Sequence, residues 1–288
     1  MPKINAERLL EDLRRLSQFG ANNPGVVRPA FSEADIEARK WLKDRYSEAG
    51  LDASIDGLGN VLGRSKKKGP AILIGSHSDS QPTGGWLDGA LGVIYGLEIA
   101  RTLSENPETQ ELAVDAVSWQ DEESRFFSSL GCRSFCGQLP YETLDGLCDK
   151  EGYPLEEALE SAGLSGVPFI KMEQGRYLGY LEGHIEQGPQ LELEQKKIGI
   201  VSSIVGVGGM VFSFKGVQNH AGTTMMNIRK DASMALFKLA AGINEEFPKV
   251  AEENSVWTMG RAILHPGAPS IVPGGAELEL QYRDVSLE

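Results

Sequence analysis

The spacing of apolar residues near the N-terminus predicts two helices. The first is indicated by leucines three and four positions apart, the period of one helix face, at Leu9, Leu10, Leu13 and Leu16. The second is predicted to begin after Ser32, because a serine followed three positions later by an acid such as Asp35 caps free backbone N–H groups. Gly50 is expected to end it.

Short apolar runs then alternate with loops and one helical pattern. Strands are predicted at 53–55, 60–63, 71–74 and 112–119, and a helix at 90–103. The run at 71–74 is uninterruptedly apolar, as in a strand that is buried on both faces. A strand–helix–strand order of this kind predicts an α/β sheet with functional residues at the carboxyl ends of its strands.

The pattern changes after about Gly206. Strands are predicted at 210–214, 256–264 and 276–282 and an amphipathic helix at 231–247, a layout that suits a small α+β sandwich. We therefore expect a first domain at 1–206 and a second at 207–288. The sequence ends at Glu288 soon after a predicted strand and without a closing element, so we expect a chain that is truncated within the second domain.

Charge and composition narrow the possible partners. The 288 residues carry 28 Lys and Arg against 41 Asp and Glu, a formal net charge of -13. This balance disfavours nucleic acid or an anionic membrane as a partner, because a negative field repels polyanions. No apolar run approaches the roughly 20 residues that cross a bilayer, and the N-terminus lacks a signal peptide.

The three cysteines, Cys132, Cys136 and Cys148, are too few for a disulfide scaffold in a chain of this length. A reducing compartment is the better expectation, so we predict a cytoplasmic protein. Cys132 and Cys136 could face the same side of a helix, but we expect them to be small buried apolar residues rather than metal ligands.

Polar residues with metal-binding chemistry follow the predicted strands. His77 lies at the carboxyl end of the strand predicted at 71–74, Asp79 is placed to support its imidazole, and Asp88 follows in a glycine-rich loop. Taken alone, these residues are better interpreted as polar caps of a loop. The second buried strand leads into three consecutive acids at 121–123, which repel one another unless a cation lies among them.

His184 adds a second imidazole with acidic neighbours. Two histidines, a shared aspartate and a glutamate match a dinuclear site for zinc, manganese or a similar ion. An adjacent glutamate that binds no metal is the residue type that accepts a proton from water in metal-dependent hydrolysis.

These motifs, taken together and in order, resemble the family of N-carbamoyl-L-amino-acid hydrolases, allantoate amidohydrolases and β-ureidopropionases. The matching stretches are Gly75–Ser80, Leu87–Gly89, Asp121–Glu123, His184–Gly188, His220–Thr224 and Arg229–Asp231. The resemblance implies a metal-bearing α/β catalytic domain, an inserted lid or dimerisation domain, and a homodimer. It also implies two divalent ions per subunit, whether zinc, manganese, cobalt or nickel.

The resemblance assigns the metal ligands by position. His77 and His184 correspond to ligands, Asp88 to the carboxylate that bridges the two ions, and Glu123 to a ligand of the second ion. Asp79 corresponds to a residue that supports a ligand from behind. His184 stands where related peptidases use an aspartate, which favours the carbamoylase branch.

The resemblance likewise assigns catalytic and substrate roles. Glu122 corresponds to the general base, and His220 to a lid histidine that stabilises the oxyanion in the partner subunit's site. Arg283 corresponds to the arginine that binds a substrate carboxylate, a task that suits a guanidinium fork. Gln187 corresponds to a residue that lines the substrate pocket, although a role in capping a loop is equally compatible.

The implied function is hydrolysis of the carbamoyl C–N bond of N-carbamoyl-L-amino acids. The alternatives are an allantoate amidohydrolase and a non-catalytic protein with a degenerate metal fold. Two departures from the family pattern bear on this choice. Ser270 stands where the family has an asparagine, and no histidine corresponds to the family's C-terminal metal ligand. We expect the 288-residue chain to be nearly inactive and a C-terminally extended one to be active.

Overall fold

The computed structural model describes residues 2–252 and 254–285, and the chain divides into two compact units. The first unit comprises residues 1–190 and the second residues 191–288. Gly206, where the sequence predicts a domain boundary, is the first residue of strand β8 in the second unit.

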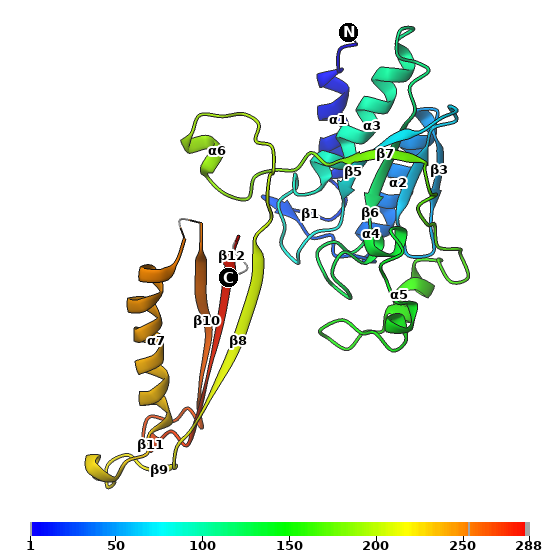
Figure 1. Ribbon diagram of the computed structural model, residues 1–288. Coiled ribbons are helices and arrows are strands. Elements are labelled where there is room, and N and C mark those ends of the chain that lie inside the picture. Colours follow the sequence, from blue (N-terminus) through cyan, green and yellow to red (C-terminus); the bar gives the residue numbers. More distant parts are fainter. Residues whose placement is uncertain (1, 253, 286–288) are drawn as a thin grey trace. The chain divides into compact units, whose positions relative to one another are not determined.

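The first unit is built on a five-stranded sheet with the order β3-β4-β6-β5-β7 (Figure 1). The strands are β3 (Asp52–Ile55), β4 (Val61–Arg64), β5 (Ala71–His77), β6 (Val114–Trp119) and β7 (Tyr177–Leu181). β5 is parallel to both β6 and β7, whereas β4 runs antiparallel to β6 and to β3. The carboxyl ends of β6, β5 and β7 therefore lie side by side at one edge.

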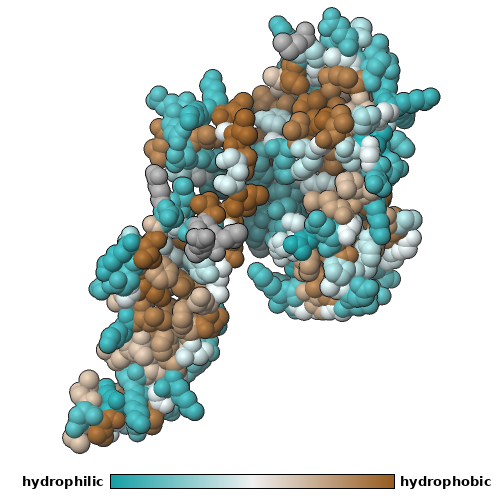
Figure 2. All heavy atoms as spheres, in the orientation of Figure 1, coloured by the Kyte–Doolittle hydropathy of each residue, from teal (hydrophilic) through white to brown (hydrophobic). Residues whose placement is uncertain are grey.

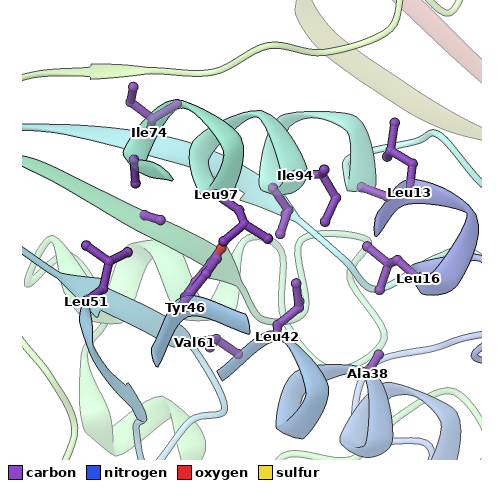
Figure 3. Packing of buried hydrophobic residues seen from close by; sticks show 14 of the residues in the cluster. Leu13, Leu16, Ala38, Leu42, Tyr46, Leu51, Val61, Ile74, Ile94 and Leu97 are labelled. Carbon is purple, nitrogen blue, oxygen red and sulfur yellow. The ribbon is translucent and has the colours of Figure 1, made fainter. Parts of the chain in front are cut away.

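Three helices cover one face of this sheet: α1 (Ala6–Leu16), α2 (Glu33–Glu48) and α3 (Ala90–Glu105). Figure 3 shows their side chains meeting in one core, with Leu42 and Tyr46 of α2 close to Leu97 of α3. The Ser32 side chain accepts a hydrogen bond from the Asp35 amide, so the predicted cap of α2 is confirmed. All seven elements predicted within 1–120 are present, with boundaries that differ by a few residues.

Side chains alternate between the two faces of the sheet, as the period of a strand requires. Ile72 and Ile74 pack in the core beneath α1–α3, whereas Leu73 packs in a second core on the opposite face. That second core contains Trp119 and also Phe135 of the short helix α4 (Leu130–Phe135). β5 is thus buried on both faces, as the sequence predicts.

Several short elements have no counterpart in the sequence prediction. The main one is β7, which completes the sheet beside β5. The others are β1 (Ala21–Asn22), β2 (Gly25–Val26), α4, η1 (Tyr141–Leu144), α5 (Leu155–Ser161), α6 (Gln190–Leu193), β9 (Asn219–His220), η2 (Met226–Ile228) and β11 (Ile271–Val272).

The second unit contains an antiparallel three-stranded sheet and one long helix. The sheet has the order β10-β12-β8, with β8 (Gly206–Lys215), β10 (Val256–His265) and β12 (Gly275–Asp284). α7 (Ala232–Val250) packs against it through Leu236, which meets Leu278 in a small core. The predicted α+β elements of this unit are therefore confirmed. Figure 2 shows brown apolar surface on this unit as well as on the first.

The cysteines differ from the sequence expectation. Cys136 and Cys148 are exposed and Cys132 is half-buried, so the prediction of buried thiols is wrong for two of the three. Cys136 directly follows the last residue of α4 and lies in an exposed segment with Gly137 and Gln138, so its side chain is in contact with solvent. Among the described residues, no helix has the length and apolarity that a membrane crossing demands.

Candidate metal centre

Three neighbouring strand ends supply the polar residues of the candidate site. His77 is the last residue of β5, Glu122 follows β6, and His184 follows β7. Because β5 is parallel to both neighbours, these side chains leave the sheet at the same edge. The rings of His77 and His184 stack with their centroids 5.8 Å apart.

His77, Asp88 and His184 form a compact cluster. One nitrogen of each ring and one carboxylate oxygen of Asp88 lie within 4.8 Å of one another. His77 Nδ1 lies 3.0 Å from the Asp79 carbonyl oxygen, and His184 Nδ1 lies 2.9 Å from that of Ile185. A carbonyl oxygen can only accept, so each ring donates through Nδ1 and, when neutral, has a lone pair on Nε2.

Only one of the two oxygens of the Asp88 carboxylate accepts a hydrogen bond. Its Oδ2 accepts a hydrogen bond of 2.9 Å from Gln187 Nε2. Its Oδ1 is buried without a hydrogen-bond partner, although His184 Nε2 lies 3.2 Å away. Two lone pairs that face each other at this distance repel, and a cation between them removes both the repulsion and the unmet hydrogen-bonding need. The residues therefore fit a divalent metal ion.

Gly89 makes the approach of His77 to Asp88 possible. It lies between the Asp88 loop and α3 with φ 62°, a left-handed conformation that favours glycine. A Cβ atom added there would lie 2.5 Å from His77 Cδ2, Nε2 and the backbone oxygen. The motif Asp88-Gly89 thus combines a candidate ligand with the space that His77 needs.

A buried ion-pair network supports His77 from behind. The Asp79 Oδ1 atom lies 3.8 Å from His77 Nδ1 and 3.7 Å from Arg39 Nη2. Arg39, on α2, donates to Asp35 at 2.9 Å and to the Trp119 carbonyl at 3.0 Å. Burial raises the pKa of Asp79, while His77 and Arg39 act in the opposite direction. Sequence analysis missed Arg39, whose α2 position carries no local signal of a site.

The three acids after β6 have different surroundings. Asp121 has φ 54°, and its carboxylate accepts hydrogen bonds from the backbone amides of 125–127. Burial raises the pKa of Asp121 to about 6, against the effect of these hydrogen bonds. The hydrogen bonds to Asp121 thus close the turn that contains Glu122 and Glu123.

Glu122 is the acid that faces the cluster. Its Oε2 atom lies 3.7 Å from His77 Nε2. Partial burial raises the pKa of Glu122, His77 lowers it, and the carboxylates of Glu123 and Asp79 raise it further. Glu123 is not part of the cluster that the described residues form; its Oε2 accepts a hydrogen bond of 2.7 Å from Gln81.

Comparison with known proteins agrees with this geometry. The family model of Peptidase family M28 matches residues 60–145, which include His77, Asp88 and Glu122. The N-carbamoyl-L-amino-acid amidohydrolase of Paenarthrobacter aurescens is 36% identical over 98% of this chain and 70% of its own length. The N-carbamoyl-L-amino acid amidohydrolase of Geobacillus stearothermophilus is 35% identical over 99% of this chain and 71% of its own length. The crystal structure of an amidase (hydantoinase/carbamoylase family) from Burkholderia phymatum matches with a TM-score of 0.93 and 53% sequence identity. The match covers 99% of this chain and 71% of the Burkholderia chain.

The chain belongs to the hydantoinase/carbamoylase family of amidases. The resemblance inferred from the motifs is therefore confirmed. The similarity to these proteins extends through both units, since the alignments cover nearly all of the chain.

The remaining candidate residues of this carbamoylase-family chain belong to the second unit. His220, on β9, pairs with Ile271 of β11, and the backbone amide of the next residue, Ala221, donates to the Ser270 carbonyl oxygen at 2.9 Å. The Gly222 amide donates to His220 Nδ1 at 3.1 Å, which leaves Nε2 as the protonated nitrogen of the exposed neutral ring. Arg283 is exposed on β12, opposite Val207 and Val256.

Gly89→Ala is expected to disrupt the carbamoylase-family site much more than Gly50→Ala. Both glycines have positive φ, 62° at Gly89 and 84° at Gly50, so both variants carry similar backbone strain. Only at Gly89 does the new methyl group collide with His77, because nothing lies within 4 Å of a Cβ at Gly50. Metal titration should show about 10-fold or greater loss of affinity for Gly89→Ala alone. Equal affinities in the two variants would contradict the steric role of Gly89.

Proposed function

We propose that the protein is a metal-dependent amidohydrolase that cleaves the carbamoyl C–N bond of N-carbamoyl-L-amino acids. The observation that carries the proposal is the unsatisfied Asp88 Oδ1 atom facing His184 Nε2, with Glu122 beside His77. Family membership adds the reaction class, hydrolysis of a C–N bond other than a peptide bond.

His77, Asp88 and His184 would hold one divalent ion, and Glu123 with Asp88 would contribute to a second. An ion bound there polarises a carbonyl group and provides positive charge near the reacting carbon. Zinc, manganese, cobalt and nickel all accept this set of imidazole and carboxylate ligands. We propose that each subunit binds two such ions and that the metal is one of these four.

Glu122 would act as the general base. Its carboxylate is only partly buried, so it can accept a proton from water and pass it to the leaving nitrogen. A raised pKa makes a carboxylate a stronger base, and burial raises that of Glu122. Asp79 and Arg39 would keep the His77 ring in its orientation while the proton moves.

His220 and Arg283 would provide the remaining polar contacts to substrate. The Nε2–H group of His220 is a donor suited to a developing oxyanion, and its Nδ1 is held by Gly222. The Arg283 guanidinium would bind the substrate carboxylate through two parallel hydrogen bonds. We propose that the second unit acts as a lid and dimerisation domain, that His220 serves the partner's site, and that the homodimer works in the cytoplasm.

An assay of the purified full-length protein tests the proposed function. The protein is treated with a chelator, loaded separately with zinc, manganese, cobalt or nickel, and supplied with N-carbamoyl-L-amino acids. Ammonia release should appear with metal and disappear without it. Allantoate serves as the competing substrate, and an N-acetyl-amino acid as a control without the ureido nitrogen. A preference for allantoate, or equal turnover of the acetyl compound, would overturn the proposed substrate class.

A further inference from the structure

A glutamine that no motif singles out contacts the carboxylate of Glu123. Gln81 lies in the loop between β5 and α3, four residues after His77. Its Nε2 atom donates to Glu123 Oε2 at 2.7 Å and to the Glu123 backbone oxygen at 3.2 Å. One amide group thus binds both the side chain and the main chain of the same residue.

The backbone amide of Glu123 is held by the same loop. It donates to Asp79 Oδ2 at 3.1 Å. Glu123 is therefore fixed at three points, two of them through Gln81, by the segment that directly follows the metal-cluster residue His77. A carboxylate that accepts a hydrogen bond at one oxygen keeps the other available, and such contacts orient carboxylates that bind metals.

We infer that Gln81 is a positioning residue for metal binding: its amide holds the Glu123 carboxylate in the orientation that ligates a second ion. The inference rests on the proposed function, because it takes Glu123 as a metal ligand. Gln81 itself binds no metal in this scheme and acts only through Glu123. Among the described residues, the Gln81 side chain makes hydrogen bonds to Glu123 and none to the cluster of His77, Asp88 and His184, so the two ions should respond differently to its loss.

Gln81→Met is the informative variant, because methionine is similar in length and removes the donor. Gln138→Met is the matched control, since Gln138 is also exposed, lies just after α4 and is none of the candidate site residues. Cobalt titrations of chelator-treated, full-length proteins, followed by calorimetry and visible absorption, measure each ion separately. Thermal unfolding of the metal-free proteins reports any general damage.

We expect Gln81→Met to weaken the binding of only one of the two ions. The wild type and Gln138→Met should bind two ions, whereas Gln81→Met should bind one with unchanged affinity and the other about 10- to 100-fold more weakly, the usual cost of losing a residue that orients a metal ligand. The melting temperature of metal-free Gln81→Met should match that of the control. Equal affinities of both ions in Gln81→Met and the wild type would overturn the inference.

A separate measurement distinguishes this inference from the proposed function. If the wild type binds fewer than two ions, the two-ion proposal fails, and the role of Gln81 is decided by a crystal structure of metal-free Gln81→Met. There the Glu123 carboxylate should leave the position it has beside Gln81. An unchanged carboxylate would show that Gln81 does not position Glu123.

Discussion

Glu122→Gln is expected to lower kcat by about 10²- to 10⁴-fold without loss of metal, the range that a positioned general base contributes. The amide has the size of the carboxylate but cannot accept a proton from water. Because Glu122 lies 3.7 Å from His77 Nε2 and is outside the cluster of His77, Asp88 and His184, the metal content should stay at the wild-type value. Initial rates and elemental analysis of the same preparation test both statements.

Glu123→Gln provides the matched comparison, since it makes the same chemical change one residue later. This variant should lose affinity for the second ion, and added metal should restore part of its activity. If Glu122→Gln lost metal and Glu123→Gln lost only turnover, the two assignments would have to be exchanged.

Asp88→Ala is expected to abolish tight metal binding and activity together. It removes the only carboxylate of the cluster in the described chain and leaves the nitrogens of His77 and His184 without a negative partner. The loss of affinity should exceed the 10- to 100-fold effect expected for Gln187→Leu, which removes only the hydrogen bond to Asp88 Oδ2.

Competition with a chromophoric chelator measures both affinities on one scale. The free energy of unfolding of the metal-free Asp88→Ala protein should remain near the wild-type value, because an unsatisfied buried oxygen is removed with the side chain. An Asp88→Ala protein that kept two tightly bound ions would refute the proposed site.

The long elements of the first unit can be predicted from sequence because their apolar positions repeat with the period of the element. The helix predicted at 90–103 corresponds to α3 (Ala90–Glu105), and the strand at 71–74 to the first part of β5. β7 gives no such signal. Its five residues are half-buried or exposed, Leu178 to 72%, and contain Gly179, so only its pairing with β5 identifies it as a strand.

Only those residues of the candidate site that stand in distinctive short motifs can be predicted from the sequence. His77, Asp88 and His184 stand in distinctive motifs, and the structure brings them together. Their proximity depends on β7, which carries His184 to the edge beside His77 and which sequence patterns do not predict.

Contacts between distant side chains were beyond prediction for a different reason. Gln81 meets Glu123 only because β5 and β6 are neighbours in the sheet, and exposed glutamines in loops rarely contact a functional group. The different surroundings of Asp121 and Glu122 likewise depend on the folded chain, since the acids are chemically alike: Asp121 accepts backbone hydrogen bonds, whereas Glu122 lies beside His77. The repulsion among consecutive acids indicates a site but does not assign their tasks.

The position of His184 after β7 has a consequence for local stability. β7 pairs with β5 alone and, like β3 at the other end of the strand order, is an edge strand of the described sheet. Because its residues are also largely exposed, it is prone to local opening. An ion bound by His184, His77 and Asp88 would cross-link the segment after β7 to the end of β5. At a concentration 100 times its dissociation constant, such an ion adds about 2.7 kcal/mol to the cost of any opening that releases it. Slow amide exchange in β7 would then report metal occupancy without any substrate.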